Sequence, residues 1–387
     1  MELELTADQE DLRDGVRAVL RAECPPARVR ELVEARVAGK DGADDALWAQ
    51  MVELGWPALP VPEAAGGLGL GAVELAVVVE ELGRALSPGP LLPTVAQFVP
   101  ALRELGSPEQ WTHFLGPVAT DGAAGTLAIA ESTGSFDPAA VGAIAAPAPG
   151  GRFAIAGRKH FVMEAAAARE IVVVARAPGT TGDAGIGAFV VPTASVEVEP
   201  LRALDPSRTL ATVTLDGAEV GPERMLGEPG PATAARLRRV VEEATVALAQ
   251  EAVGTAQTVF DIALEYAKQR EQFGVPIGSF QAIKHKFADM LILLERARAL
   301  GYFAALTIAE DDERRTVSAS MAKAAAGDAA ARIAKEGIQI LGGIGYTWEH
   351  DMHLYVRRLQ SSAVLFGTAA AHRAVVADSI GIPRTAT

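Results

Sequence analysis

Apolar residues recur every three or four positions through the first third of the chain, a spacing that predicts amphipathic helices. The clearest stripes are Leu12, Val16, Val19 and Leu20, followed by Leu75, Val78, Val79 and Leu82. The segments 55–71 and 87–93 are rich in proline and glycine, as ordered loops between helices are. We therefore expect an all-α N-terminal domain over residues 1–118.

The pattern changes to short runs of β-favouring residues between residues 119 and 230. Strands are expected at 125–130, 152–157, 171–176, 187–192 and 210–215, each bounded by turn-forming residues. Strands that follow one another without intervening helices favour an antiparallel sandwich or barrel over a doubly wound sheet. The sequence thus predicts a central antiparallel β domain over residues 119–230.

Helical spacing returns after residue 230 and persists over longer stretches. Residues 237–270 keep it for about nine turns, which is typical of a long bundle helix. Further helices are expected at 280–300, 316–341 and 352–380. We expect a C-terminal four-helix bundle over residues 231–387, and an α+β multidomain fold for the whole chain.

Composition and charge narrow the class of protein. Of the 387 residues 49% are hydrophobic and 22% charged, which is ordinary for a folded protein. The formal net charge of −14 argues against nucleic acid as a partner. The single cysteine, Cys24, excludes an internal disulfide. The N-terminus lacks the features of a signal peptide and no apolar stretch spans a bilayer, so we expect a cytoplasmic protein without membrane partners.

Two motifs suggest chemistry but have simpler explanations. The glycine-rich run 66–71 resembles a dinucleotide fingerprint, yet it follows a proline-rich loop instead of a strand. The segment 348–353 places His350 and His353 beside two carboxylates, without HExxH spacing or a remote third ligand. A loop in the first case and a polar helix start in the second are the favoured interpretations, and we expect no metal.

Two further segments sit at the ends of predicted bundle helices. Residues 266–282 end a helix with a cation, turn through glycine and proline, and start another helix; residues 338–346 stop a helix in a Gly-Gly-x-Gly turn. Guanidinium, amide and glycine-exposed backbone N–H groups at helix ends suit a phosphate-bearing cofactor. Helix termination alone explains the same residues equally well, so both interpretations stay open.

The order helical, β, helical, together with residues 266–290, 338–358 and 55–85, resembles the acyl-CoA dehydrogenases over almost the entire chain. The resemblance implies FAD, a tetramer, and a role in lipid metabolism. In that family the flavin lies between the β domain and the bundle of one subunit, while its adenine half reaches a neighbouring subunit. By motif match, the residues expected to contact the neighbour's pyrophosphate and ribityl region are Arg270, Gln272, Phe273, Phe280 and Gln281. Those expected on the adenosine side are Gln339, Gly342, Gly343 and Thr368.

The flavin side departs from the family pattern. Where a Thr-Glu-Pro-Gly-Ala-Gly-Ser-Asp segment is usual, residues 130–137 have Ala130 for the Thr and Phe136 for the Ser. Where a Trp-Ile-Thr stretch is usual, residues 161–163 read Phe-Val-Met, which removes a hydroxyl donor toward flavin N5. Hydrogen bonding to the flavin ring is therefore expected to be weaker than in the family.

The catalytic base is also missing from its usual places. Abstracting a proton α to a thioester needs a carboxylate in a dry pocket, and the two usual slots hold Phe366 and Ala244. Glu243 is one residue off the second slot, about 100° round the helix. Glu251 lies seven residues after Ala244 on the same face. Both carboxylates are candidate bases, and a structural role is the alternative for each.

We therefore expect an acyl-CoA dehydrogenase subunit that acts on acyl-CoA thioesters, bulky sterol-derived or cyclic ones among them. The leading hypothesis is an α2β2 complex in which this chain supplies FAD contacts in trans to a homologous catalytic subunit. The alternatives are a self-sufficient homotetramer that uses Glu243 or Glu251 as base, and a non-catalytic assembly scaffold without FAD. An electron-transfer flavoprotein is the expected acceptor.

Overall fold

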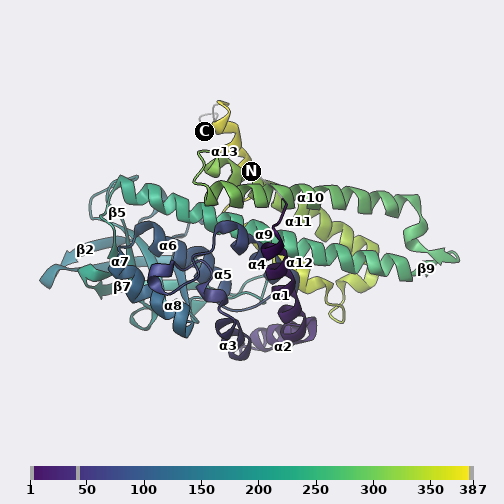
Figure 1. The fold of residues 1–387 in the computed structure, drawn as a ribbon, viewed down its shortest axis with the longest axis horizontal. Coiled ribbons are helices and arrows are strands. Elements are labelled where there is room, and N and C mark those ends of the chain that lie inside the picture. Colours follow the sequence, from purple (N-terminus) through teal and green to yellow (C-terminus); the bar gives the residue numbers. More distant parts are fainter. Residues whose placement is uncertain (1–3, 41–43, 383–387) are drawn as a thin grey trace. The chain divides into compact units, whose positions relative to one another are not determined.

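The computed structural model describes residues 4–40 and 44–382 (Figure 1). The described residues form two compact units, one built from those within 1–42, 72–87 and 245–387, and the other from those within 43–71 and 88–244. The helices of the first third are thus distributed over both units. Helix α9, Pro231–Gln269, is continuous through the boundary between them. In the described residues, no helix has both the length and the apolar character needed to cross a membrane.

The first unit begins with α1 (Ala7–Glu23) and α2 (Pro26–Val37), and continues with α4 (Ala72–Ala85). A capping box starts α1, in which Thr6 accepts from Gln9 N and the Gln9 side chain accepts from Thr6 N. Of the predicted stripe of α1, Val16 and Leu20 are buried, whereas Leu12 and Val19 are half-buried.

The bundle helices complete this unit (Figure 1). After α9 the chain passes through the short strands β9 (Glu271–Gln272) and β10 (Val275–Pro276) into α10 (Gln281–Ala309) and α11 (Arg315–Leu341). A 3₁₀ turn, Gly342–Tyr346, leads to α12 (Met352–Ser362) and α13 (Ala369–Ser379). The sequence pattern predicted a single helix over 352–380, but Phe366 (φ 56°) and Gly367 (φ 101°) interrupt it, because left-handed residues end a helix.

The second unit packs short helices on a sheet. Its helices are α3 (Asp45–Glu53), α5 (Leu91–Pro93), α6 (Val99–Leu105), α7 (Pro108–Gln110) and α8 (Gly116–Asp121), with π-helical turns at Thr94–Phe98 and Trp111–Leu115. One continuous apolar core joins α6 and α8 to the sheet, including Leu102, Val118, Val172 and Val190. The sheet is therefore the second unit's central scaffold.

The sheet has the strand order β6-β7-β3-β2-β4-β5-β8, with β1 paired to β4. Its strands are β1 (Gly125–Ala128), β2 (Ile144–Ala148), β3 (Arg152–Met163), β4 (Glu170–Arg176), β5 (Ile186–Pro192), β6 (Glu197–Pro200), β7 (Leu210–Val220) and β8 (Met225–Leu226). Most pairings are antiparallel, as expected. β4 differs, because it pairs in parallel with β1 and with Ile144, the first residue of β2.

Candidate functional site

The end of the bundle that carries β9 presents several residues expected to contact the nucleotide. Arg270 directly follows α9, and the tight β9–β10 turn pairs Gln272 with Val275. Phe273 (φ 55°) and Gly274 (φ 78°) both take the left-handed conformation that this turn needs. The Arg270 guanidinium is exposed and has no side-chain partner in the described residues. The turn thus displays an unengaged cation to solvent.

The second nucleotide motif lies at the same end of the bundle. α10 and α11 are antiparallel neighbours, and Lys286 near the start of α10 forms an ion pair with Glu336 near the end of α11. Gly342, with φ 67°, ends α11. Gly342 and Gly343 are exposed, and a Cβ added at either would meet no atom within 4 Å. The backbone here is open to approach by a ligand, and exposed Gln339 lies one turn earlier.

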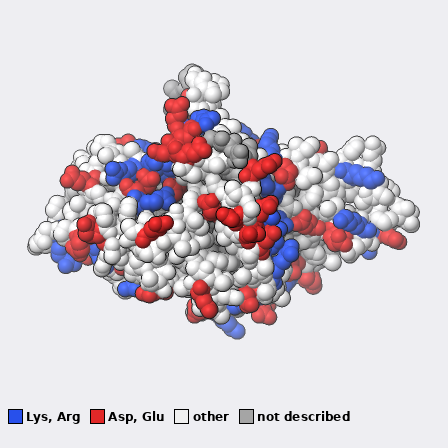
Figure 2. Space-filling view, in the orientation of Figure 1, with Lys and Arg blue, Asp and Glu red and all other residues white. Residues whose placement is uncertain are grey.

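This bundle end is also unusually apolar. Figure 2 shows it as largely white surface with separate charged side chains. The exposed fractions of its large apolar side chains are 93% for Phe273, 78% for Tyr346, 44% for Ile344, and 39% for Phe280 and Val275. Phe273 and Phe280 face each other edge to face at 6.2 Å between ring centroids. Apolar surface gathered in this way marks a binding or protein interface.

Thr368 lies elsewhere in the bundle. It caps α13 by accepting from Ala371 N at 3.2 Å, and the next residue, Ala369, lies against Gly327 in the middle of α11. Gly327 is 15 residues before Gly342 on α11, about 22 Å along the helix axis. One chain therefore does not bring Thr368 together with the glycine pair.

The position where the resemblance places a catalytic base holds a buried aromatic ring. Phe366 is 5% exposed and has φ 56°, a conformation that costs about 1–3 kcal/mol unless its surroundings hold it. His372 contributes to that hold, because its Nε2 lies 2.9 Å from the Phe366 carbonyl oxygen and its Nδ1 lies 3.2 Å from Ser320 Oγ. Burial lowers the pKa of His372, so a neutral ring that donates through Nε2 fits both contacts.

Glu251 forms an ion pair inside the bundle. Arg358 Nη1 donates to Glu251 Oε1 at 2.7 Å, and the two side chains are 2% and 3% exposed respectively. The pair joins α9 to α12, 107 residues apart in the chain. Carboxylates this deeply buried are ordinarily paired with a cation. The Arg358 guanidinium hydrogen-bonds to an oxygen of Glu251 through which Glu251 would accept a proton if it were the base.

Glu243 is engaged in a comparable way in the second unit. Arg103 Nη2 on α6 donates to both Glu243 oxygens at 2.6 and 2.5 Å, and the Glu243 side chain is 6% exposed. The neighbouring Arg239 forms an ion pair with Glu104 at 3.0 Å. Both candidate bases are thus held by arginines that the sequence patterns did not associate with them.

The segments expected on the flavin side lie in the second unit and lack a hydroxyl at positions 130, 136 and 163. Ala130 is 1% exposed and Met163 is 2% exposed. Gln97, in a π-helical turn, donates through Nε2 to Met163 Sδ at 3.1 Å. Phe161, with φ 57°, is 39% exposed, whereas Phe136 packs against the core. Of the residues that differ from the family pattern, Ala130 and Met163 are therefore buried, Phe136 is partly buried and Phe161 is exposed.

A buried ion pair supports this segment. Lys159 Nζ, in a side chain that is fully buried, donates to Glu131 Oε1 at 2.7 Å, and Glu131 accepts from the backbone N–H groups of Gly142 and Ala143. Burial lowers the pKa of Lys159 to about 8, against the opposing effect of Glu131. Neither residue was a candidate in the sequence, because a Lys–Glu pair 28 residues apart has no local signature.

This pair predicts a pH dependence of stability. Between pH 8 and pH 10.5 the unfolded chain holds the Lys159 proton and the folded chain does not, so stability should rise with pH in that window. Wild type should therefore gain stability relative to Lys159→Met as the pH rises from 8 to 10. Urea unfolding of both proteins at the two pH values measures the difference. Parallel pH profiles would contradict the lowered pKa.

The histidines of segment 348–353 have structural contacts. His350 Nδ1 accepts from Met352 N at 3.0 Å, and the His353 ring stacks on Trp348 at 4.4 Å between centroids. Asp351 forms an ion pair with Arg30 of α2 at 2.5 Å. These contacts dock α2 against the start of α12. The described residues contain no group of three or more potential ligands that could hold a metal ion.

The residues at the end of the bundle can be compared with what the nucleotide half of FAD requires. An unengaged guanidinium, exposed amides and an open glycine backbone fit a diphosphate and its attached groups. The ring half lacks a hydroxyl at three positions where the family pattern has one, namely Ala130, Phe136 and Met163. The chain is thus better equipped for the nucleotide half than for the ring.

Comparison with known proteins agrees with the sequence motifs. The N-terminal, middle and C-terminal domain families of acyl-CoA dehydrogenases match residues 6–122, 126–219 and 237–381 respectively. Acyl-CoA dehydrogenase IpdE2 of Mycobacterium tuberculosis is 34% identical over 360 residues, which cover 92% of each chain. Acyl-CoA dehydrogenase FadE34 of the same organism is 37% identical over 361 residues, 92% of this chain but 45% of FadE34. The chain therefore spans less than half the length of that relative.

The fold matches solved structures equally well. A chain of the ChsE4–ChsE5 complex from Mycobacterium tuberculosis superposes with a TM-score of 0.87 at 25% identity, covering 100% of both chains. The helical, β and helical parts, the matched domain families and the relatives agree. The chain therefore belongs to the acyl-CoA dehydrogenase family, whose members are FAD-dependent oxidoreductases that act on CH–CH groups.

Proposed function

We propose that this chain is the subunit of an α2β2 acyl-CoA dehydrogenase that supplies FAD contacts in trans and has no catalytic base of its own. The homologous partner subunit would carry the base and the flavin pocket. The substrate is an acyl-CoA thioester, which the complex dehydrogenates between its α and β carbons.

The observation that carries the proposal is the state of the carboxylates. Dehydrogenation needs a carboxylate free to take the α proton, while bound FAD accepts the hydride that leaves the β carbon. Glu251 and Glu243 are each held by an arginine at 2.7 Å or less. Phe366 fills the usual slot with a buried ring. A partner that supplies the base accounts for all three.

The end of the bundle supports the second half of the proposal. At this end of the bundle, the partner's FAD would have its pyrophosphate and ribityl region held by Arg270, Gln272 and Gln281. Phe273 and Phe280 would cover the same region. Gln339 and the glycines 342 and 343 would line the adenosine, whereas Thr368 lies about 22 Å away along α11 and would not contact the same nucleotide. The exposed apolar side chains at this end suit burial against another chain. The similarity to a ChsE4–ChsE5 complex favours two unlike subunits.

The experiment compares the lone chain with a complex formed by a co-expressed homologous subunit. We expect acyl-CoA to bleach the flavin absorbance of the complex and not that of the lone chain. Arg270→Ala should weaken FAD retention by the complex about 10- to 100-fold, because it removes a charge-assisted contact. Lys268→Ala is the matched control, since Lys268 is an exposed cation of the same helix end that pairs with Glu265.

Two outcomes would replace the proposal with its alternatives. Bleaching by the lone chain that is lost in Glu251→Gln or Glu243→Gln would make the chain a self-sufficient homotetrameric enzyme. A complex without flavin would make it an assembly scaffold. Equal FAD retention by Arg270→Ala and Lys268→Ala would contradict the contact in trans.

A further inference from the structure

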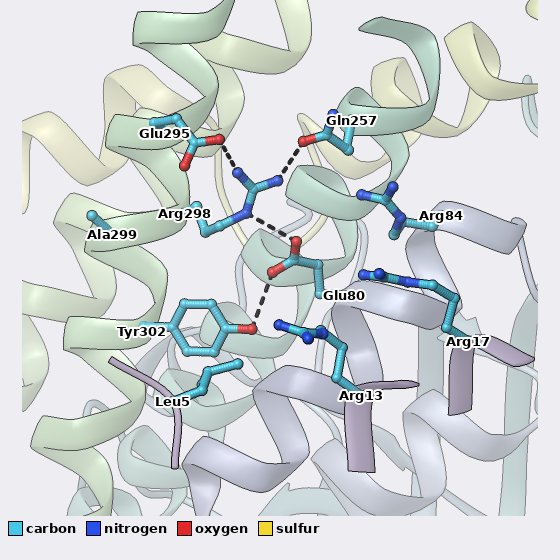
Figure 3. Close-up of a pocket in the computed structure, with 10 residues that line it drawn as sticks. All are labelled: Leu5, Arg13, Arg17, Glu80, Arg84, Gln257, Glu295, Arg298, Ala299 and Tyr302. Carbon is cyan, nitrogen blue, oxygen red and sulfur yellow. Dashed lines mark hydrogen bonds and ion pairs between the residues drawn. The ribbon is translucent and has the colours of Figure 1, made fainter. Parts of the chain in front are cut away.

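A pocket of about 500 Å³ lies in the first unit, among α1, α4, α9 and α10 (Figure 3). Its lining residues are Leu5, Arg13, Arg17, Glu80, Arg84, Gln257, Glu295, Arg298, Ala299 and Tyr302. Four arginines against two glutamates give the lining a formal charge of +2, in a protein whose net charge is −14. Each of these arginines also contacts a carboxylate, so the pocket presents a set of oriented, ion-paired guanidinium groups.

The floor of the pocket is a hydrogen-bonded network in which the charged side chains are paired with one another. Glu80, 6% exposed, accepts from Arg298 Nε at 3.0 Å and from the Tyr302 hydroxyl at 3.2 Å. Burial and the adjacent Glu80 raise the pKa of Tyr302, so its hydroxyl stays protonated and donates. Arg298 also donates to Gln257 Oε1 at 2.7 Å and to Glu295. The floor therefore does not repel an anion as a free carboxylate would.

The wall has three arginines whose guanidinium groups are only partly engaged. Arg17 donates through Nε and Nη2 to Glu81, Arg13 donates through Nε to Asp14, and Arg84 donates through Nη2 to Asp261. These carboxylates fix the direction of each guanidinium. Within residues 4–40 and 44–382, Nη1 of each of the three arginines makes no hydrogen bond, although Arg13 Nη1 lies 3.7 Å from Glu10 Oε1 and Arg17 Nη1 lies 4.0 Å from Asp14 Oδ1.

The three guanidinium groups converge. Figure 3 shows Arg13, Arg17 and Arg84 extending in the same direction, toward Glu80 and Arg298. Their side chains are 29%, 29% and 22% exposed, so each is partly withdrawn from water yet reachable. Oriented, partly desolvated arginines are the groups that proteins use to bind phosphate oxygens.

We propose that this pocket binds a small molecule that carries a diphosphate, such as a nucleoside diphosphate. Three donors arranged along one wall match the several oxygens of a diphosphate better than a single phosphate. The volume leaves room for an attached group beside the Tyr302 ring and the apolar side chains of Leu5 and Ala299. Nothing in this inference depends on the function proposed above.

The pocket is separate from the nucleotide contacts at the end of the bundle. Arg298 lies 17 residues after Gln281 on α10, about 25 Å along the helix axis. A diphosphate ligand could bind at either place, so an experiment must tell the two apart. Variants at Arg270 and variants in the pocket make that distinction.

The test is isothermal titration calorimetry of the full chain, at low ionic strength, with inorganic pyrophosphate, ADP and orthophosphate. We expect saturable binding of pyrophosphate and ADP, and weaker binding of orthophosphate. Arg13→Gln and Arg84→Gln should each weaken binding of pyrophosphate about tenfold or more, the effect of losing one charge-assisted contact. Arg84→Lys should weaken binding of pyrophosphate as well, because an ammonium keeps the charge but lacks the paired, coplanar N–H donors of a guanidinium.

Two control variants assign the site. Arg314→Gln removes an exposed arginine of the same unit that pairs with Asp312 outside the pocket, and it should bind as wild type does. In Arg270→Ala, the component of pyrophosphate binding that Arg13→Gln and Arg84→Gln weaken should persist. No saturable binding at millimolar pyrophosphate, loss of binding in Arg270→Ala with none in Arg13→Gln, or equal affinity for orthophosphate would each overturn the proposal. Circular dichroism of every variant checks that it folds.

Discussion

Replacing Arg358 by methionine is expected to lower the free energy of unfolding by about 3–5 kcal/mol, the usual cost of leaving a buried charge without its partner. The reason is that Glu251, 3% exposed, would lose the guanidinium that contacts it at 2.7 Å. Methionine keeps much of the volume of the arginine stem, so the loss reports on charge more than on packing. Thermal and urea unfolding at pH 7 measure it.

The matched control removes both charges. A Glu251→Met, Arg358→Met double variant should recover most of the stability, because replacing a buried ion pair by apolar side chains is often neutral or stabilising. A double variant that is as unstable as the sum of the single variants would show that the residues act independently. That result would remove the ion pair as the explanation for a buried Glu251.

The same variants bear on catalysis. If Glu251 serves only to hold Arg358, Glu251→Gln should lower stability and leave the activity of the assembled complex within about twofold of wild type. If Glu251 is a base, activity should fall by about 10²-fold or more, the usual contribution of a positioned base. Single-turnover bleaching of the complex separates the two.

Gly254→Ala is expected to destabilise the first unit by about 3 kcal/mol, at the upper end of the usual cost of overpacking. A Cβ at Gly254 would lie 1.9 Å from the Glu80 carbonyl oxygen, and one at Gly83 would lie 2.1 Å from the Glu251 carbonyl oxygen. Both neighbours are helix backbone, which cannot rotate away as a side chain can. α4 and α9 must therefore separate to admit a single methyl group.

Gly15→Ala provides the contrasting control for this prediction. Gly15 lies inside α1, and a Cβ there would meet no atom within 4 Å. Alanine should stabilise that helix by roughly 0.5–1 kcal/mol, because it reduces the backbone entropy of the unfolded chain. Thermal unfolding of the two variants should thus shift in opposite directions. A Gly254→Ala protein as stable as wild type would show that the helix crossing is loosely packed.

Helices and strands could be predicted from the sequence where their signal lies between residues close together in the chain. The spacing in residues 237–270 identified α9, and β-favouring runs identified β3, β4, β5 and β7, because amphipathic periodicity is a local property. The parallel pairing of β1 with β4 had no such signal, since it depends on which strands meet in space. The break between α12 and α13 was missed because Phe366 is not a residue that favours φ 56°.

The features of the candidate site also differ in whether the sequence could predict them. The turn after Arg270 and the glycine pair at 342 and 343 could be found from sequence, because each is a short contiguous motif at a helix end. The arginines that engage the candidate bases could not, since Arg358 is 107 residues from Glu251 and Arg103 is 140 residues from Glu243. The arginine pocket also draws its residues from four separate segments.

The sequence by itself thus determined the family, the order of helical and β parts, and the absence of an acidic residue from positions 244 and 366, where the resemblance places the base. Only the tertiary structure decided that Glu243 and Glu251 lie in ion pairs with arginines and that α4 and α9 cross at glycines. It also decided that the partly engaged guanidinium groups of Arg13, Arg17 and Arg84 converge. The physical reason is that helix and strand patterns arise between residues close in the chain. Burial, charge pairing and close helix crossings arise between residues that only folding brings together.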